Sequence, residues 1–198
     1  MEGKGGGNGL NKDVADVLYS RDAISKRVSA LGKEIAEDFK GKRPLIVGIL
    51  KGCFMFFSDL CKEIDPVPDG CEVHFAKARS YEGNTCESNQ SVKLTFLGGE
   101  DEGELIRGRH VVLVEDIVDT GNTLKAMLGA LKGLGAKSVT VATFLDKKCR
   151  RTVPDLELGY VGFECPDAFV IGYGMDYGEK YRTLPYVGVL KEDVYQTS

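Results

Sequence analysis

The sequence has no long apolar run, and none approaches the roughly 20 consecutive apolar residues that a membrane-spanning helix requires. It also has no excess of basic residues, since 26 Lys and Arg stand against 30 Asp and Glu, for a net charge of −4. This balance disfavours a broad surface for nucleic acid or for an anionic membrane, and we expect neither as a partner. A local cationic pocket for a small phosphorylated ligand remains compatible with it.

Paired cysteine motifs are absent as well. Six cysteines are present, but no two have the C-x-x-C spacing of zinc or redox sites. Residues 1–8 are glycine-rich and lack the apolar segment of a secretory signal, so we expect residues 1–10 to form a disordered tail. These features predict free thiols in a reducing compartment, the cytoplasm.

Two common nucleotide-binding motifs are also missing. No G-x-x-x-x-G-K-[ST] occurs, which excludes a Walker-type phosphate loop. Gly133-Leu134-Gly135 follows a predicted helix rather than a strand, and Ser138 stands where the third glycine of a dinucleotide fingerprint would be. Any nucleotide chemistry must therefore use another kind of site.

The 198 residues are expected to form a single domain over 1–198. Apolar residues at steps of three and four from Ile24 to Phe39 predict an amphipathic helix, with Ser20 as its N-cap and Gly41 just past its end. Runs at 44–50, 73–75, 92–97, 111–114 and 138–145 predict strands, a helix is predicted over 122–134, and residues 80–91 predict a long loop. Alternating strands and helices predict an α/β fold with a central, mostly parallel twisted sheet flanked by helices.

The most informative segment follows the strand predicted at 111–114. Glu115 and Asp116 are adjacent, Asp119 comes three residues later, and Thr120-Gly-Asn-Thr123 then opens a helical pattern. Adjacent carboxylates suit a sugar diol and Mg²⁺, whereas amide groups at a helix start suit a phosphate. The alternative is a solvated acidic loop with Asp119 or Thr120 as helix N-cap, but the threonines and the glycine favour a ribose phosphate site.

This pattern resembles the signature of type I phosphoribosyltransferases, which bind 5-phosphoribosyl-1-pyrophosphate. Leu50-Lys51-Gly52 resembles the pyrophosphate loop of the hypoxanthine-guanine phosphoribosyltransferases, and Ser80-Tyr81 resembles their flexible-loop pair. Lys147 matches their purine-contacting lysine region, and residues 161–182 are similar to their C-terminal hood segment. The similarity runs in order from about residue 20 to residue 190.

The resemblance implies a purine salvage enzyme that transfers the 5-phosphoribosyl group to hypoxanthine or guanine, giving IMP or GMP and pyrophosphate. It implies Mg²⁺ as cofactor, a homodimer or homotetramer, and a small hood lobe built from the N-terminal part and about residues 160–198. Asp119 would be the general base. The 5′-phosphate would be held by Ile117, Val118, Asp119, Thr120, Gly121, Asn122 and Thr123.

The remaining implied roles fall into five groups. These are Glu115 and Asp116 for the ribose; Leu50, Lys51, Gly52 and Arg182 for pyrophosphate; Lys147, Phe169, Val170 and Asp176 for the purine; Glu115, Asp116 and Asp176 for the metal; and Ser80 and Tyr81 for closing a loop over the site.

One residue departs from the family pattern, because many members carry lysine where Asn122 stands. Its absence predicts weaker attraction of the phosphate without loss of the backbone amides. Two alternatives to the purine enzyme stay open: a transferase for another oxo-base such as xanthine or uracil, and a regulatory protein that senses the donor. No motif ranks hypoxanthine, guanine and xanthine as substrates.

Overall fold

A six-stranded sheet forms the centre of the molecule in the computed structural model, which describes residues 11–81, 91–99 and 101–196. Its strand order is β4-β3-β2-β5-β6-β7; β3 and β4 pair antiparallel, and the other neighbours pair parallel. The strands are β2 (Pro44–Ile49), β3 (Glu72–Tyr81), β4 (Ser91–Phe96), β5 (His110–Val118), β6 (Ser138–Asp146) and β7 (Tyr160–Glu164). The predicted α/β fold with a mostly parallel sheet is confirmed.

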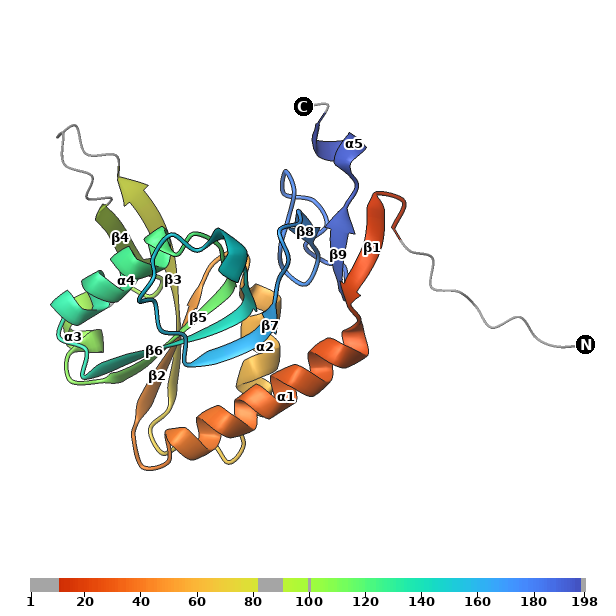
Figure 1. Cartoon of the computed structure of the whole chain (residues 1–198). Helices are drawn as coiled ribbons and strands as arrows, with labels where there is room; N and C mark the ends of the chain where they lie inside the picture. The colour runs from red at the N-terminus through yellow and green to blue at the C-terminus, as the bar shows by residue number, and fades with distance from the viewer. Residues whose placement is uncertain (1–10, 82–90, 100, 197–198) are drawn as a thin grey trace, which may run out of the picture.

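Helices cover both faces of this sheet (Figure 1). On one face lie α1 (Arg21–Asp38) and α2 (Phe54–Glu63), and on the other lie α3 (Glu102–Ile106) and α4 (Asn122–Gly133). Strand β5 supplies both cores, because Val112 and Val114 pack with the first layer and Val111 and Leu113 with the second. This continuous apolar run is what a parallel strand buried on both faces requires.

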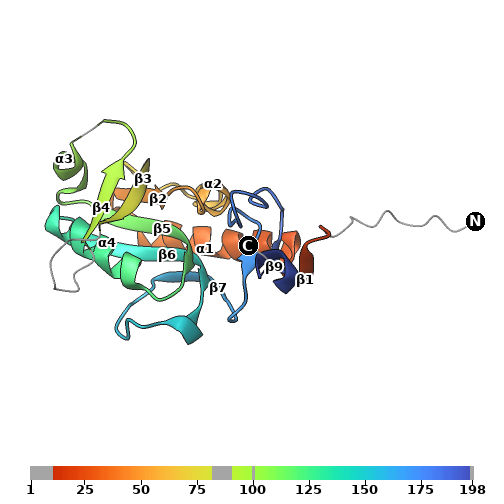
Figure 2. The same cartoon turned by 90° about the horizontal axis from the view of Figure 1, so that it is seen from above.

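A second, smaller sheet lies beside the carboxyl ends of the core strands (Figure 2). Its order is β1-β9-β8, all antiparallel, with β1 (Val14–Tyr19), β8 (Val170–Ile171) and β9 (Val187–Leu190). We call this sheet, together with the 172–186 segment that joins β8 to β9, the hood. It takes strands from both ends of the chain, and α5 (Glu192–Tyr195) follows it.

The predicted helix boundaries hold where capping chemistry marks them. The Ser20 side chain accepts a hydrogen bond from the Ala23 amide at the start of α1, and Gly41 has a positive φ of 69° just beyond its end. Within the described ranges, no helix combines the length and the apolarity needed to cross a membrane.

Three sequence predictions need correction or lie outside the description. Strand β5 was expected to end at Val114 but continues to Val118, so Glu115 and Asp116 lie inside the strand. The backbones of Ser80 and Tyr81 belong to β3 and not to a loop, because they pair with β4. The expected tail at 1–10, the 82–90 segment and the side chains of Ser80 and Tyr81 lie outside the described structure.

Candidate active site

Residues at the carboxyl ends of β5 and β6 and at the start of the hood line an open pocket of about 220 Å³. Parallel strands place their carboxyl ends at one edge of the sheet, which is where α/β proteins bind ligands. The pocket brings together residues that are up to 60 positions apart in the sequence: Asp116, Ile117, Asp119, Lys147, Phe169, Val170, Met175 and Asp176. Seven of these eight residues were predicted site residues, and Met175 was not.

The adjacent acids Glu115 and Asp116 carry the strongest electrostatic signal of the site. Burial raises the pKa of Glu115 well above its ordinary value, and the Asp116 carboxylate beside it adds to the shift. Burial also raises the pKa of Asp116, although the Ile117 amide donates to its Oδ1 at 2.9 Å. Two desolvated acids side by side are unfavourable alone, so they are suited to a partner that supplies hydroxyl donors or positive charge.

The segment after β5 turns into α4 without a side-chain cap. Gly121 is the N-cap residue with φ +87° and has no side chain to cap the helix, and the amide of Asn122 donates to Thr120 Oγ1 at 3.5 Å. The N-cap position is therefore held by Gly121 and not by Asp119 or Thr120, although the Thr120 hydroxyl contacts the first amide of the helix. The Thr120 carbonyl instead accepts from the amide and hydroxyl of Thr152 at 3.0 and 3.2 Å. This leaves a glycine turn and a helix start that can receive an anion.

Asp119 lines the pocket and is paired with a residue that the sequence prediction missed. Arg150, from the short 3-10 helix Lys148–Arg150, donates through Nε to Asp119 Oδ1 at 2.8 Å. The same guanidinium reaches Asp167 Oδ1 at 3.3 Å through Nη1. The pairing holds the Asp119 carboxylate in one orientation beside Lys147 and Phe169.

The loop after β2 approaches the acids closely. The Leu50–Lys51 peptide bond is cis, and the Leu50 amide donates to the Ala76 carbonyl at 3.0 Å. A Cβ atom on Gly52 would lie 1.5 Å from Asp116 Oδ2. The loop therefore passes directly over an acid of the predicted ribose site.

Arg182 connects the hood to this loop through an acid that no motif indicated. Its guanidinium contacts Asp176 Oδ1 at 2.8 Å and Glu179 Oε1 at 3.1 Å. Glu179 also accepts from Lys51 Nζ at 2.8 Å, and the pKa of Glu179 is lowered by Lys51 and Arg182 together. Lys51 and Arg182, predicted to share one anionic ligand, here share one carboxylate.

The opposite side of the pocket carries Lys147 and Phe169. Lys147 is buried, and its Nζ donates to the Ala168 carbonyl at 2.8 Å while its amide donates to Val118 at 2.9 Å. The Phe169 ring is 39% exposed and stacks on Tyr195 at 5.3 Å between centroids. An exposed aromatic ring beside a positioned ammonium group is suited to a flat, polar base.

The predicted metal ligands do not form a metal site by themselves. Among the residues that the structure describes, no group of three or more His, Cys, Asp or Glu side chains is arranged to hold a metal ion. Asp176 is instead engaged by Arg182. The acids still fit Mg²⁺, which takes one or two carboxylates, several waters and the phosphates of a substrate.

The fold and this site define a phosphoribosyltransferase, and the family model of the phosphoribosyl transferase domain matches residues 15–178. The chain is 44% identical to the hypoxanthine-guanine phosphoribosyltransferase of Streptococcus pneumoniae over 94% of this chain and 98% of that protein. A hypoxanthine phosphoribosyltransferase structure from Staphylococcus aureus matches with a TM-score of 0.81 at 40% identity, covering 92% of this chain and 95% of that one. The chain belongs to the hypoxanthine-guanine phosphoribosyltransferase family.

A longer relative contains the same domain. The bifunctional protein TilS/HprT of Listeria monocytogenes is 40% identical over 96% of this chain. The chain spans 28% of the length of that protein.

Proposed function

We propose that the chain transfers the 5-phosphoribosyl group from phosphoribosyl pyrophosphate to hypoxanthine or guanine, releasing pyrophosphate and IMP or GMP. The observation that carries this proposal is the single pocket in which Asp116, Asp119, Lys147 and Phe169 meet, with the 50–52 loop crossing over Asp116. Sugar, phosphate, pyrophosphate and base groups would each find a chemically matched surface there.

On the donor side, Glu115 and Asp116 would accept hydrogen bonds from the ribose hydroxyls. The amides from Thr120 to Thr123 would hold the 5′-phosphate at the start of α4, together with the backbone of Ile117, Val118 and Asp119. Lys51 and Arg182 would leave Glu179 and neutralise the pyrophosphate, because charge on that group grows as its bond to C1′ breaks.

On the acceptor side, Phe169 would stack on the purine and Val170 would contact its edge through the backbone. Lys147 Nζ would donate to the 6-oxo group, whereas the amino group of adenine would leave this ammonium unpaired. Asp119 would accept the proton that the imidazole ring loses as its nitrogen attacks C1′.

Glu115, Asp116 and Asp176 are the residues that would hold Mg²⁺, which supplies Lewis-acid stabilisation of the departing pyrophosphate when it is bound. Ser80 and Tyr81 would limit access of water from their place at the end of β3. We further propose a homodimer or homotetramer that acts in the cytoplasm, which agrees with the free thiols of the five described cysteines.

A panel of hypoxanthine, guanine, xanthine, uracil and adenine, assayed with donor and Mg²⁺, tests the proposal. We expect turnover with hypoxanthine or guanine and none with adenine or uracil. Donor binding without turnover of any base would contradict the transferase and support a donor-sensing regulator. Turnover of xanthine or uracil in place of hypoxanthine and guanine would redirect the proposal to another oxo-base.

A further inference from the structure

We propose that Tyr173 and Asp59 are positioning residues whose hydrogen bond holds the hood against the 50–52 loop, so that Arg182 and Gly52 face the pyrophosphate of the donor together. Neither residue lines the pocket described above. The inference rests on the proposed function, because it assigns these residues an effect on binding of the donor and not of the base.

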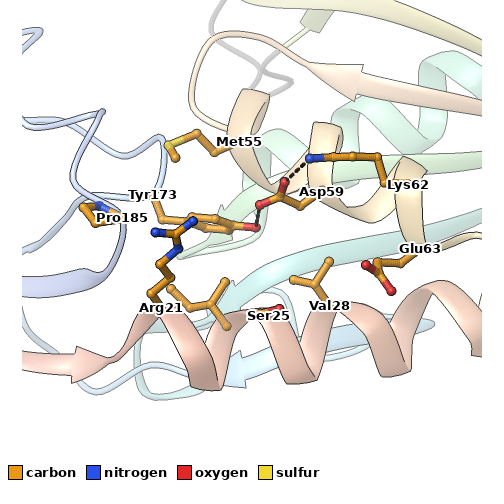
Figure 3. A pocket seen from close by; sticks show the side chains of 10 residues that line it. Arg21, Ser25, Val28, Met55, Asp59, Lys62, Glu63, Tyr173 and Pro185 are labelled. Carbon is orange, nitrogen blue, oxygen red and sulfur yellow. Dashed lines mark hydrogen bonds and ion pairs between the residues drawn. The ribbon is translucent and has the colours of Figure 1, made fainter.

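The Tyr173 side chain runs from the hood into the space between α1 and α2 (Figure 3). Its hydroxyl donates to Asp59 Oδ2 on α2 at 2.9 Å, and the residue is 3% exposed. Its ring packs against the buried Phe144 of β6 at 4.7 Å between centroids. The other Asp59 oxygen accepts from Lys62 at 2.7 Å, so the carboxylate is held from both sides.

The backbone around Tyr173 is folded in a way that packing must maintain. Gly172, Tyr173 and Gly174 have φ values of +92°, +48° and +101°, so Tyr173 has a positive φ although it carries a side chain. Side-chain-bearing residues rarely adopt this conformation, and they keep it where their surroundings fix it. The amides of Tyr173 and Gly174 donate to Leu184 and Arg182 carbonyls at 2.8 and 2.9 Å, which closes the turn on itself.

This turn touches both parts of the predicted pyrophosphate site. A Cβ on Gly174 would lie 2.0 Å from the Gly52 carbonyl oxygen, so the two backbones are in direct contact. The Gly174 carbonyl accepts from Arg182 Nη1 at 2.8 Å. Asp59 belongs to α2, which begins two residues after Gly52. The bond between Tyr173 and Asp59 therefore joins α2, which follows the loop that contains Gly52, to the turn that is hydrogen-bonded to Arg182.

A cavity of about 500 Å³ lies beside this bond. It is lined by Arg21 and Ser25 of α1, by Met55, Asp59 and Lys62 of α2, and by Tyr173 (Figure 3). The cavity leaves part of the hood out of contact with α1 and α2 on this side, although Tyr173 and Val187 of the hood belong to the same buried core as both helices. The hydrogen bond between Tyr173 and Asp59 adds a directional contact to this apolar packing.

Tyr173→Phe tests the proposal, since it removes the hydroxyl and keeps the ring on Phe144. We expect the KM and the Kd for phosphoribosyl pyrophosphate to rise about fivefold to tenfold, the scale of one lost hydrogen bond. The KM for the base and kcat at saturating donor should change by less than about twofold. Asp59→Ala should have the same effect, and Asp59→Asn, which keeps an acceptor oxygen, should remain close to wild type.

Tyr160→Phe is the matched control. Tyr160 is also a buried phenol that donates to a carboxylate, Asp38 Oδ2 at 2.7 Å, but it lies at the amino end of β7, away from the site. We expect it to lower thermal stability as Tyr173→Phe does and to leave the donor KM unchanged. A donor KM and Kd unaffected by Tyr173→Phe, or raised equally by Tyr160→Phe, would overturn the proposal.

Failure of the proposed function is distinguishable from failure of this inference. Absence of turnover by the wild-type chain would contradict the transferase. Calorimetric titration of the donor into the wild type and the two phenylalanine variants would still decide whether Tyr173 positions its binding site.

Discussion

Gly52 and Asp116 are in such close contact that no side chain fits between them: a Cβ on Gly52 would lie 1.5 Å from Asp116 Oδ2. The contact exists because β2 and β5 are parallel neighbours, so the loop after β2 passes over the carboxyl end of β5. It fixes the distance between the predicted pyrophosphate and ribose groups.

Gly52→Ala should therefore reduce kcat/KM by at least about 100-fold, because either the loop or Asp116 must move and misplacement of that size costs about this much in rate. Steady-state kinetics with varied donor measures it. Gly129→Ala is the control, since a Cβ there meets nothing within 4 Å and alanine favours the α4 helix. An active Gly52→Ala variant would show that the loop does not need this contact.

Asp119→Asn should lower kcat with hypoxanthine or guanine by about 10²–10⁴-fold, because the amide cannot take the imidazole proton. The donor should still bind, since the backbone of the phosphate segment is unchanged. Single-turnover kinetics and donor titration measure the two effects separately. Asp167→Asn, which changes the other carboxylate on Arg150, should stay within about twofold of wild type; an undiminished rate for Asp119→Asn would remove Asp119 from the base role.

Lys147→Met should raise the KM for the base by about tenfold to 100-fold, the range expected for losing a charged hydrogen-bond donor in a buried setting. The KM for the donor should not change. Lys148→Met is the adjacent control, because Lys148 is exposed and pairs with Glu164 at 3.0 Å outside the pocket. Equal effects of the two substitutions on the base would rule out a specific role for Lys147.

Glu115→Gln should stabilise the ligand-free protein at neutral pH while impairing activity. Burial raises the folded-state pKa of Glu115 above its ordinary value of 4.5. The folded chain therefore binds the proton of the Glu115 carboxyl group more tightly than the unfolded chain does. Its contribution to stability is full below pH 4.5 and is lost as the pH rises through the folded-state pKa.

Thermal unfolding from pH 4 to pH 8 measures this difference, with the exposed Glu157→Gln as control. The variant should melt above wild type at pH 7 and 8, and the gap should close toward pH 4. A lower melting temperature of Glu115→Gln at neutral pH would contradict the expected cost of the buried charge.

The central sheet and its first helix could be predicted from the sequence, because short, continuous patterns of apolar residues mark them. The apolar runs of β2, β5 and β6 and the stripe of α1 determined the α/β class. Strand β1 was not predicted, because among its six residues only Val14 is buried and no alternation marks it. Its partner β9 has four residues, and the pairing joins positions about 170 residues apart, which no local pattern reports.

The limits of the site prediction have a similar cause. The acids after Val114 were placed beyond the strand, because carboxylates are uncommon in strand interiors. Pairing with β6 as far as Val118 overrides this preference. The short helix α3 was missed although Asp101 accepts from the Glu104 amide, a capping pattern visible in the sequence. Arg150 and Glu179 carry no motif, and their contacts to Asp119 and Lys51 depend on tertiary structure alone.

The hood has a consequence for biosynthesis, since its sheet combines β1 with β8 and β9. Strands β2 to β7 leave the ribosome before β9, so the central sheet can close while the last hood strand is still inside the exit tunnel. Arg182 and Asp176 lie between β8 and β9, so their positions are not yet fixed while β9 is unpaired. A nascent chain at this stage contains only the half of the binding site that the central sheet provides. Strand β9 must emerge and pair with β1 before the two halves can act on a shared substrate.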